Sequence, residues 1–381
     1  MSPIRRPPLR VWVWTAATVA LLLVAAVLRR GSDAAATQST TAPPAGVPSG
    51  TPAGAVSEAW SADGGPLPET VVQEGRVLVG SAHGVRALDP VTGKEAWHYT
   101  RANARMCGVT VTDGVAVAVF ATADRCDEAV ALDAGTGVRA WTKSLSLAGD
   151  AVLDSTAAIV LAHNPTGLLT LDPTGNNVRW RFAAPEGCRF LAADAGSTGV
   201  AVLQRCGTSD VQVRLLDGFA GSAHWSRDLP VPAGTEVRLL GADRAVTVLV
   251  GDEVQTLSGP DGSVLARLPV PAGTTDVEQE TFDSVSLVRI GGAVSAVDAS
   301  TGAALWTAPA TGLPAPSGSV EEADAPAALV LPDAEGFSSR DPVTGAELAR
   351  FGAPGVPAGG NASVIGPVVV LRLDDRVVGY R

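Results

Sequence analysis

Four cysteines have a spacing that predicts chemistry directly. They form two local pairs, 107 with 126 and 188 with 206, at separations of 19 and 18 residues. We expect disulfides in this pairing. The pairings 107–188 with 126–206 and 107–206 with 126–188 stay open, as do four buried thiols. Disulfides form in oxidising compartments, so the pattern places the folded body outside the cytoplasm. The candidate disulfide residues are Cys107, Cys126, Cys188 and Cys206.

Other patterns typical of catalysis or metal binding do not occur in the sequence. The four histidines, at 83, 98, 163 and 224, are scattered and lack H-E-x-x-H spacing. Gly93-Lys94 lacks the following Ser/Thr and the glycines of a phosphate-binding loop, and there is no G-x-S-x-G. We therefore expect no catalytic, cofactor-binding or metal-binding residue, and no cofactor.

Aspartates recur at a fixed distance from tryptophans, and we interpret them as structural residues rather than metal ligands. The segment VRALDPVTGKEAW, which ends at Trp97, returns in copies that end at Trp141, Trp180, Trp225 and Trp306. In each copy an Asp precedes the Trp by eight residues. We expect the Asp to accept backbone N–H groups in a turn, the Gly to adopt φ > 0 and the Trp to fill space between units. The predicted structural residues are Trp60, Asp89, Gly93, Trp97, Asp133, Gly137, Trp141, Asp172, Trp180, Asp217, Trp225, Asp298, Gly302 and Trp306.

The repeat predicts an all-β fold with eight blades. Register positions 60, 97, 141, 180, 225, 266, 306 and 349 lie 37 to 45 residues apart, and a period near 40 built from short strands is typical of a four-stranded propeller blade. Trp60 has no preceding strand pattern, whereas the C-terminal end has strands but no closing one. We expect the two ends to share the last blade. Seven blades is the alternative, because the copy around 327–351 is degenerate.

The Ala-x-Asp-x-x-Thr-Gly-x-x-x-Trp core, clearest at Ala87–Trp97 and Ala131–Trp141, resembles the repeat of the pyrroloquinoline quinone (PQQ) propeller superfamily. That superfamily includes quinoprotein dehydrogenases and an eight-bladed lipoprotein that helps assemble outer-membrane proteins. The resemblance covers about residues 55–381 and implies a propeller used as a binding scaffold. The adjacent cysteine pair of the dehydrogenases is missing, and no cysteine precedes Cys107 to carry a lipid.

An apolar run from Val11 to Leu28 predicts a membrane helix. Its 18 residues would reach roughly 27 Å, about one hydrocarbon thickness. A cleavable signal peptide is the alternative, with a cleavage site at 34–36, but the length of the run and Arg29-Arg30 favour an uncleaved anchor. We expect 1–10 to be a cytoplasmic tail, 11–28 a transmembrane helix, 29–54 a disordered Ala/Pro/Thr/Ser/Gly linker and 55–381 the propeller.

The net charge indicates which class of binding partner to exclude. The chain carries a net charge of −11, and because residues 1–30 hold five arginines and no acid, the remainder carries −16. An acidic body repels phosphate backbones, so we expect no nucleic-acid partner.

We interpret the chain as a single-pass cell-membrane protein with a monomeric extracytoplasmic propeller. It would act as a non-catalytic scaffold for a protein or cell-envelope ligand, contacted on the face that carries 121–128 and 204–210. The alternative function is enzymatic: a divergent PQQ-dependent oxidoreductase, or a hydrolase that uses carboxylates at the central channel.

Overall fold

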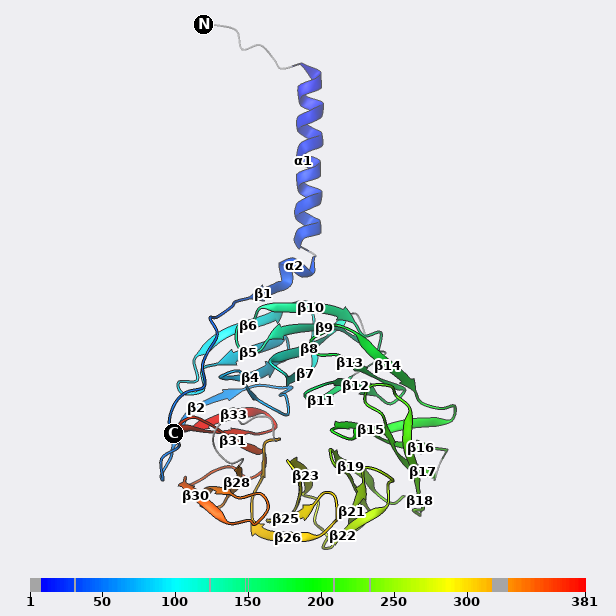
Figure 1. The fold of residues 1–381 in the computed structure, drawn as a ribbon. Coiled ribbons are helices and arrows are strands. Elements are labelled where there is room, and N and C mark those ends of the chain that lie inside the picture. Colours follow the sequence, from blue (N-terminus) through cyan, green and yellow to red (C-terminus); the bar gives the residue numbers. More distant parts are fainter. Residues whose placement is uncertain are drawn as a thin grey trace.

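The chain folds into an eight-bladed β-propeller, the larger of the two blade numbers considered from the repeat (Figure 1). The computed structural model describes residues 8–30, 32–122, 125–147, 149, 151–207, 210–232, 234–316 and 328–381. Apart from one two-residue strand that pairs in parallel, the strands of each blade run antiparallel from a central channel to the rim, and Figure 1 views the ring along that channel.

The first four blades follow one another along the chain, each named from its channel strand outward. Blade 1 comprises β3 (Val72–Gln73), β4 (Arg76–Ser81), β5 (Gly84–Leu88) and β6 (Glu95–Arg101). Blade 2 comprises β7 (Met106–Thr112), β8 (Val115–Thr122), β9 (Arg125–Asp133) and β10 (Arg139–Ser144). Blade 3 comprises β11 (Val152–Ser155), β12 (Val160–Asn164), β13 (Gly167–Leu171) and β14 (Val178–Ala183). Blade 4 comprises β15 (Cys188–Gly196), β16 (Gly199–Cys206), β17 (Asp210–Leu216) and β18 (Ala223–Leu229).

The last four blades complete the ring. Blade 5 comprises β19 (Val237–Ala242), β20 (Ala245–Val250), β21 (Glu253–Ser258) and β22 (Val264–Pro269). Blade 6 comprises β23 (Val277–Phe282), β24 (Val285–Ile290), β25 (Ala293–Asp298) and β26 (Ala304–Pro309). Blade 7 is a three-stranded sheet of β28 (Leu329–Asp333), β29 (Gly336–Arg340) and β30 (Glu347–Gly352), and the short strand β27 (Leu313–Pro314) lies beside it at the channel. Blade 8 comprises β31 (Asn361–Ile365), β32 (Val368–Arg372), β33 (Arg376–Tyr380) and β2 (Glu58–Asp63).

The two ends of the propeller sequence share blade 8. Strand β2 pairs antiparallel with β33, with Glu58 opposite Tyr380 and Trp60 opposite Gly379. The pairing closes the ring and leaves no inner strand edge exposed at the junction.

Apolar side chains fill the seams between neighbouring blades. Each of the eight core clusters contains residues of two adjacent blades. The cluster around Trp97, for example, joins blade 1 to Phe120 and Leu132 of blade 2. The core is therefore a ring of interfaces, because each sheet can bury its two faces only against the next sheets.

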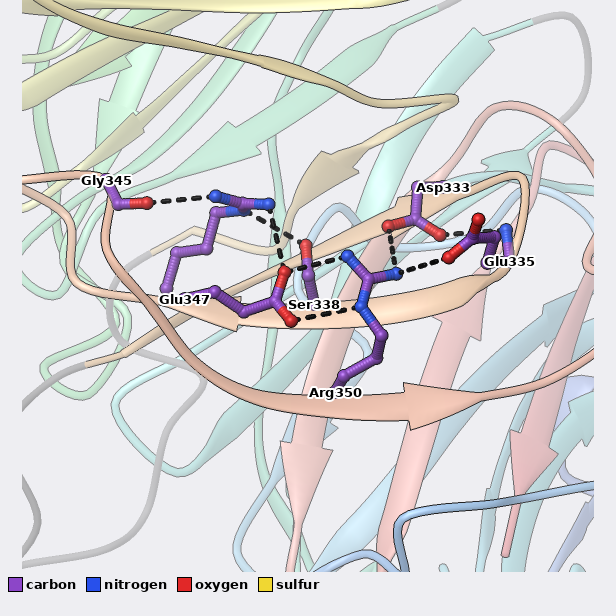
Figure 2. Close-up of polar contacts among 7 residues, drawn as sticks. Asp333, Glu335, Ser338, Gly345, Glu347 and Arg350 are labelled. Atoms are coloured by element: carbon purple, nitrogen blue, oxygen red, sulfur yellow. Dashed lines mark hydrogen bonds and ion pairs between the residues drawn. The ribbon is translucent and has the colours of Figure 1, made fainter.

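Blade 7 departs from the pattern. Its channel strand β27 is two residues long and pairs in parallel with β31 of blade 8. An ion-pair network joins its outer strands (Figure 2). Arg350 lies 3.0 Å from Asp333 and 2.7 Å from Glu347, and Glu347 also lies 3.2 Å from Arg340. These polar contacts link the three strands of the blade 7 sheet, β28, β29 and β30.

Helix α1 (Leu9–Arg30) precedes the propeller. Residues Leu9–Val27 are long and apolar enough to cross a membrane and are not buried against the propeller, and a signal sequence near an N-terminus has the same properties. The remainder of the expected tail, residues 1–7, lies outside the described residues.

The segment after α1 differs from the disordered linker expected over 29–54. Helix α2 (Asp33–Ala36) and strand β1 (Thr37–Ser39) lie against blade 1, where β1 pairs antiparallel with β6 as a fifth strand. The Asp33 carboxylate lies 3.0 Å from the Arg101 guanidinium. Further on, the Val56 amide donates to the Gly352 carbonyl at the edge of blade 7 (2.8 Å). The physical reason is that outer blade strands offer unpaired backbone groups, which even an apolar-poor segment can satisfy. We call residues 33–56 the strap.

Candidate functional site

Seven acidic residues line a central cavity of about 950 Å³, and the pKa values of four of them are raised. Glu69 precedes β3, whereas the other three come from channel strands: Asp154 from β11, Asp194 from β15 and Glu280 from β23. The channel strands of a propeller stand parallel around its axis, so residues far apart in sequence meet there. The exposed ring of Phe219 lies at the same cavity, where the Arg179 guanidinium stacks on it at 4.7 Å.

Two of these carboxyl groups bond to the backbone of the next blade. Oδ2 of Asp154 accepts from the Ala195 amide of blade 4 at 2.5 Å, and Oδ2 of Asp194 accepts from the Ala242 amide of blade 5 at 2.5 Å. The Asp154 and Asp194 carboxyl groups are also hydrogen-bonded to each other. Blades 3, 4 and 5 are therefore linked by a continuous polar chain at the channel.

The surroundings favour protonated carboxyl groups. Burial, followed by the charge of Asp194 and the hydrogen bond to it, raises the pKa of Asp154 well above its usual value. Burial raises the pKa of Asp194 to about 6, although its hydrogen bond to Asp154 acts in the opposite direction. Two carboxyl groups in such contact do not both ionise readily, so the pair retains a proton that a single exposed Asp would lose.

The pKa values of the two glutamates of the cavity are raised as well. Enclosure by protein raises the pKa of Glu69 to about 8, and Asp154 adds to the shift, while Arg372 partly offsets it. The Glu69 side chain still contacts solvent within the cavity. Burial, with the charge of Glu69 second, raises the pKa of Glu280 well above its usual value. Carboxyl groups that stay protonated near neutral pH can donate as well as accept hydrogen bonds.

The sequence reasoning missed these four residues as a group. They lie in different repeats, and no local motif joins them. For Asp154 and Asp194 the signal that could have revealed them is an acidic residue inside an apolar channel strand, as in VLDS at 152–155 and FLAADAG at 190–196. Within the described ranges no group of three or more His, Cys, Asp or Glu residues has the geometry to hold a metal ion.

The cysteines form two disulfides within single blades. Cys107 is bonded to Cys126 in blade 2 and Cys188 to Cys206 in blade 4, with Cα atoms 5.9 and 4.0 Å apart. These bonds lie at the propeller face where the second strand of each blade turns into the third, which we call the cysteine face. Residues 123–124 and 208–209 of the two adjoining turns, including Asp124, lie outside the described residues.

The repeated aspartates bond within their own turns. Oδ1 of Asp89 accepts from the Thr92 amide at 2.8 Å, and the same bond recurs at 2.8 Å between Asp133 and Thr136 and between Asp298 and Thr301. In a variant of the motif, Asp172 accepts from the Gly175 amide at 2.8 Å. Asp217 lines the central cavity, and its Oδ1 is bonded to the Phe219 and Ala220 amides at 2.8 and 2.6 Å.

Each repeat tryptophan donates from Nε1 to the carbonyl that follows the turn aspartate, or its counterpart, of the next blade. The acceptors are Pro90 for Trp60, Ala134 for Trp97, Pro173 for Trp141, Gly218 for Trp180, Gly259 for Trp225 and Pro342 for Trp306. A turn glycine packs under the indole: a Cβ at Gly93 would come within 2.5 Å of Trp60, and one at Gly137 within 2.7 Å of Trp97. At Gly302 the nearest neighbour is Leu265 of the preceding blade instead of an indole, because that blade has Ala266 where other repeats have Trp.

The histidines occupy separate places. His98 bonds to Glu95 (2.7 Å), His224 lies 3.6 Å from Asp217, and His83 bonds to the Ala104 carbonyl (2.8 Å). His163 is buried, and burial lowers its pKa to about 4, so it is neutral at physiological pH.

Comparison with known proteins identifies the family. The family described as outer membrane protein assembly factor BamB matches residues 46–189 and 128–318, which together cover well over half of the chain. No curated protein matches the sequence.

Three solved structures illustrate the similarity in fold. BamB from Moraxella catarrhalis is 18% identical, with a TM-score of 0.48 over 86% of this chain and 99% of that chain. The computationally designed Ika8 protein is 15% identical, with a TM-score of 0.53 over 85% and 99%. A europium-containing methanol dehydrogenase is 13% identical, with a TM-score of 0.48 over 83% and 84%. Among these three, the Ika8 structure alone has a TM-score above 0.5, and it bears on the fold alone. The sequence match is specific: the chain belongs to the family described as outer membrane protein assembly factor BamB, whose members carry the PQQ-like propeller repeat.

Proposed function

We propose that this protein is a membrane-anchored, extracytoplasmic scaffold that binds a protein of the cell envelope. Helix α1 is the uncleaved anchor, the chain before it is cytoplasmic, and the propeller is a monomeric, non-catalytic body. Family membership and the two disulfides support an envelope location.

The observation that carries the proposal is the restraint of the cysteine face. Each disulfide joins two strand ends of one blade, beside the turns at 122–125 and 206–210. Binding costs less free energy when a surface is already ordered, so strand ends that a disulfide holds together suit a docking platform. We place the partner on this face, over residues 121–128 and 204–210.

The anchor is tested by the mass of the mature protein. Intact-mass analysis of protein extracted from membranes is expected to show a chain that retains α1, and washing at alkaline pH is expected to leave it in the membrane. Loss of the first 30 or so residues would show that α1 is a signal peptide and would overturn this part of the proposal.

A thermal melt with PQQ and Ca²⁺ tests the scaffold function against a quinoprotein enzyme. A ligand at 100 times its Kd stabilises the folded chain by about 2.7 kcal/mol, which raises the midpoint measurably. We expect no saturable rise with the two ligands together. A saturable rise would contradict a non-catalytic scaffold and favour the oxidoreductase.

A further inference from the structure

Two arginines lie directly opposite each other at the cysteine face of blade 4. In the antiparallel pair β15–β16, Arg189 is opposite Arg205, and the next pair is the disulfide-bonded Cys188 and Cys206 (strands in Figure 1). Arg189 is exposed and Arg205 is half-buried. The disulfide holds the two strand ends together, so the arginines stay neighbours.

This pairing is unfavourable in the protein alone. Like charges directly opposite each other destabilise an antiparallel sheet. Among the described side chains, neither arginine forms an ion pair, and Nε of Arg205 is buried without a hydrogen-bond partner. A buried donor without an acceptor costs free energy, and the same holds for Nε of Arg86 and Arg227. The feature specific to this site is that two guanidinium groups without an acidic partner lie on directly opposite residues.

The two most deeply buried arginines of the described residues each lie between two acidic side chains. Arg289 lies 2.5 Å from Asp276 and 2.8 Å from Glu278. Arg101 lies 2.7 Å from Glu128 and 3.0 Å from Asp33. Residues 31–381 carry a net charge of −16, so acidic side chains outnumber basic ones in this part of the chain. Arg189 and Arg205 differ from these two, because they lie opposite each other and no ion pair joins either of them to a described acidic side chain.

We propose that Arg189 and Arg205 together form a carboxylate-binding site for an acidic segment of a protein partner. Guanidinium groups bind carboxylates through paired, charge-assisted hydrogen bonds, and two of them side by side suit consecutive Asp or Glu residues. The strap joins the ring at blade 1, three blades away from this site, which favours a protein segment over the membrane that holds α1. The inference rests on the proposed function and names the chemistry of the partner.

The test uses the full chain in nanodiscs of uncharged lipid at low ionic strength, with fluorescent hexaglutamate as the probe. Wild type is expected to bind hexaglutamate and not hexaglutamine. The R189Q/R205Q variant is expected to lose affinity by about tenfold or more. The matched control R139Q/R244Q removes two exposed arginines at the opposite face and is expected to bind as wild type does. Equal affinities in the two double variants, or no binding by wild type, would overturn the proposal.

Three further measurements keep the result specific. The melting midpoint of R189Q/R205Q is expected to equal or exceed that of wild type, because a repulsion is removed; a large fall would show a structural role instead. Inorganic phosphate that displaces hexaglutamate at equal concentration would indicate a simple anion site. Binding to phosphatidylglycerol vesicles that depends on the two arginines, without hexaglutamate binding, would indicate a lipid surface. Either of these last results would overturn the acidic-segment assignment.

Failure of this inference is separable from failure of the proposed function. If a partner crosslinks to the cysteine face in wild type and equally in R189Q/R205Q, the scaffold function stands and the carboxylate site does not. If hexaglutamate binds through the arginines but no partner crosslinks to that face, the site stands and the scaffold function does not.

Discussion

Trp97 of blade 1 donates a hydrogen bond from Nε1 to the carbonyl of Ala134 in blade 2, at 3.0 Å. The indole is fully buried and lies over Gly137 of the same turn. Equivalent bonds join five other pairs of neighbouring blades. Each repeat that has the tryptophan thus supplies a donor to the next repeat, whose turn supplies the acceptor, which explains why Asp, Gly and Trp recur together.

Removing this contact is expected to destabilise the ring. Trp97→Ala should lower the free energy of unfolding by about 3–5 kcal/mol, because a large buried side chain is lost and the Ala134 carbonyl loses its donor. Urea denaturation followed by circular dichroism measures the change. Leu348→Ala, at a side chain that is 55% exposed, is the control and should shift stability by no more than about 0.5 kcal/mol. Similar losses in the two variants would contradict the structural role of the repeat tryptophans.

Each disulfide is expected to stabilise the fold separately. Replacing both Cys107 and Cys126 with Ser should lower stability by about 3 kcal/mol, since the bond closes a short loop, and the same holds for Cys188 and Cys206. Unfolding of the two double variants under non-reducing conditions gives both values. Wild-type stability in both variants would mean that the bonds do not form in the mature protein.

Stability is expected to fall as pH rises from 5 to 8, with Glu69 among the causes. Its pKa in the folded chain, about 8, lies above its ordinary value, so the folded state holds a proton that the unfolded state has released. Glu69→Gln should therefore reduce the loss of stability over this interval. Urea unfolding at both pH values, with Glu186→Gln as an exposed control, checks the effect. An unchanged pH dependence in Glu69→Gln would argue against a raised pKa.

The strap is expected to protect backbone amides from exchange. The Thr40 amide donates to the His98 carbonyl at 2.9 Å and the Ala42 amide to the Thr136 carbonyl at 2.9 Å, so both should exchange slowly with solvent. Thr40→Pro removes one of these donors and should speed exchange at 36–42 while the blades stay protected. Fast exchange over 36–42 in wild type would show that this segment is a free linker in solution.

The sequence predicts most of the architecture but little of the arrangement of side chains in the central channel. The Asp-to-Trp interval predicts blade number, ring closure and the turns because these features repeat, so each copy reinforces the others. Asp154, Asp194 and Glu280 lie in three different blades and are not part of the repeated motif. Only the closed ring brings them together at one cavity. The strap was also missed, because its binding to blade 1 depends on backbone groups of β6, which side-chain composition does not reveal.

Photo-crosslinking from the two faces of blade 2 tests the central claim most directly. Benzoylphenylalanine placed at Arg125 reports on the cysteine face, and the same residue at Val138, which is 53% exposed, reports on the opposite face. In native membranes we predict one discrete protein adduct from position 125, none from position 138, and loss of the adduct when Arg205 and Asp210 in the blade 4 turn are reversed in charge. An adduct from position 138 alone, or one from position 125 that survives the charge reversal, would contradict a partner bound across the two disulfide-bonded strand ends of the cysteine face.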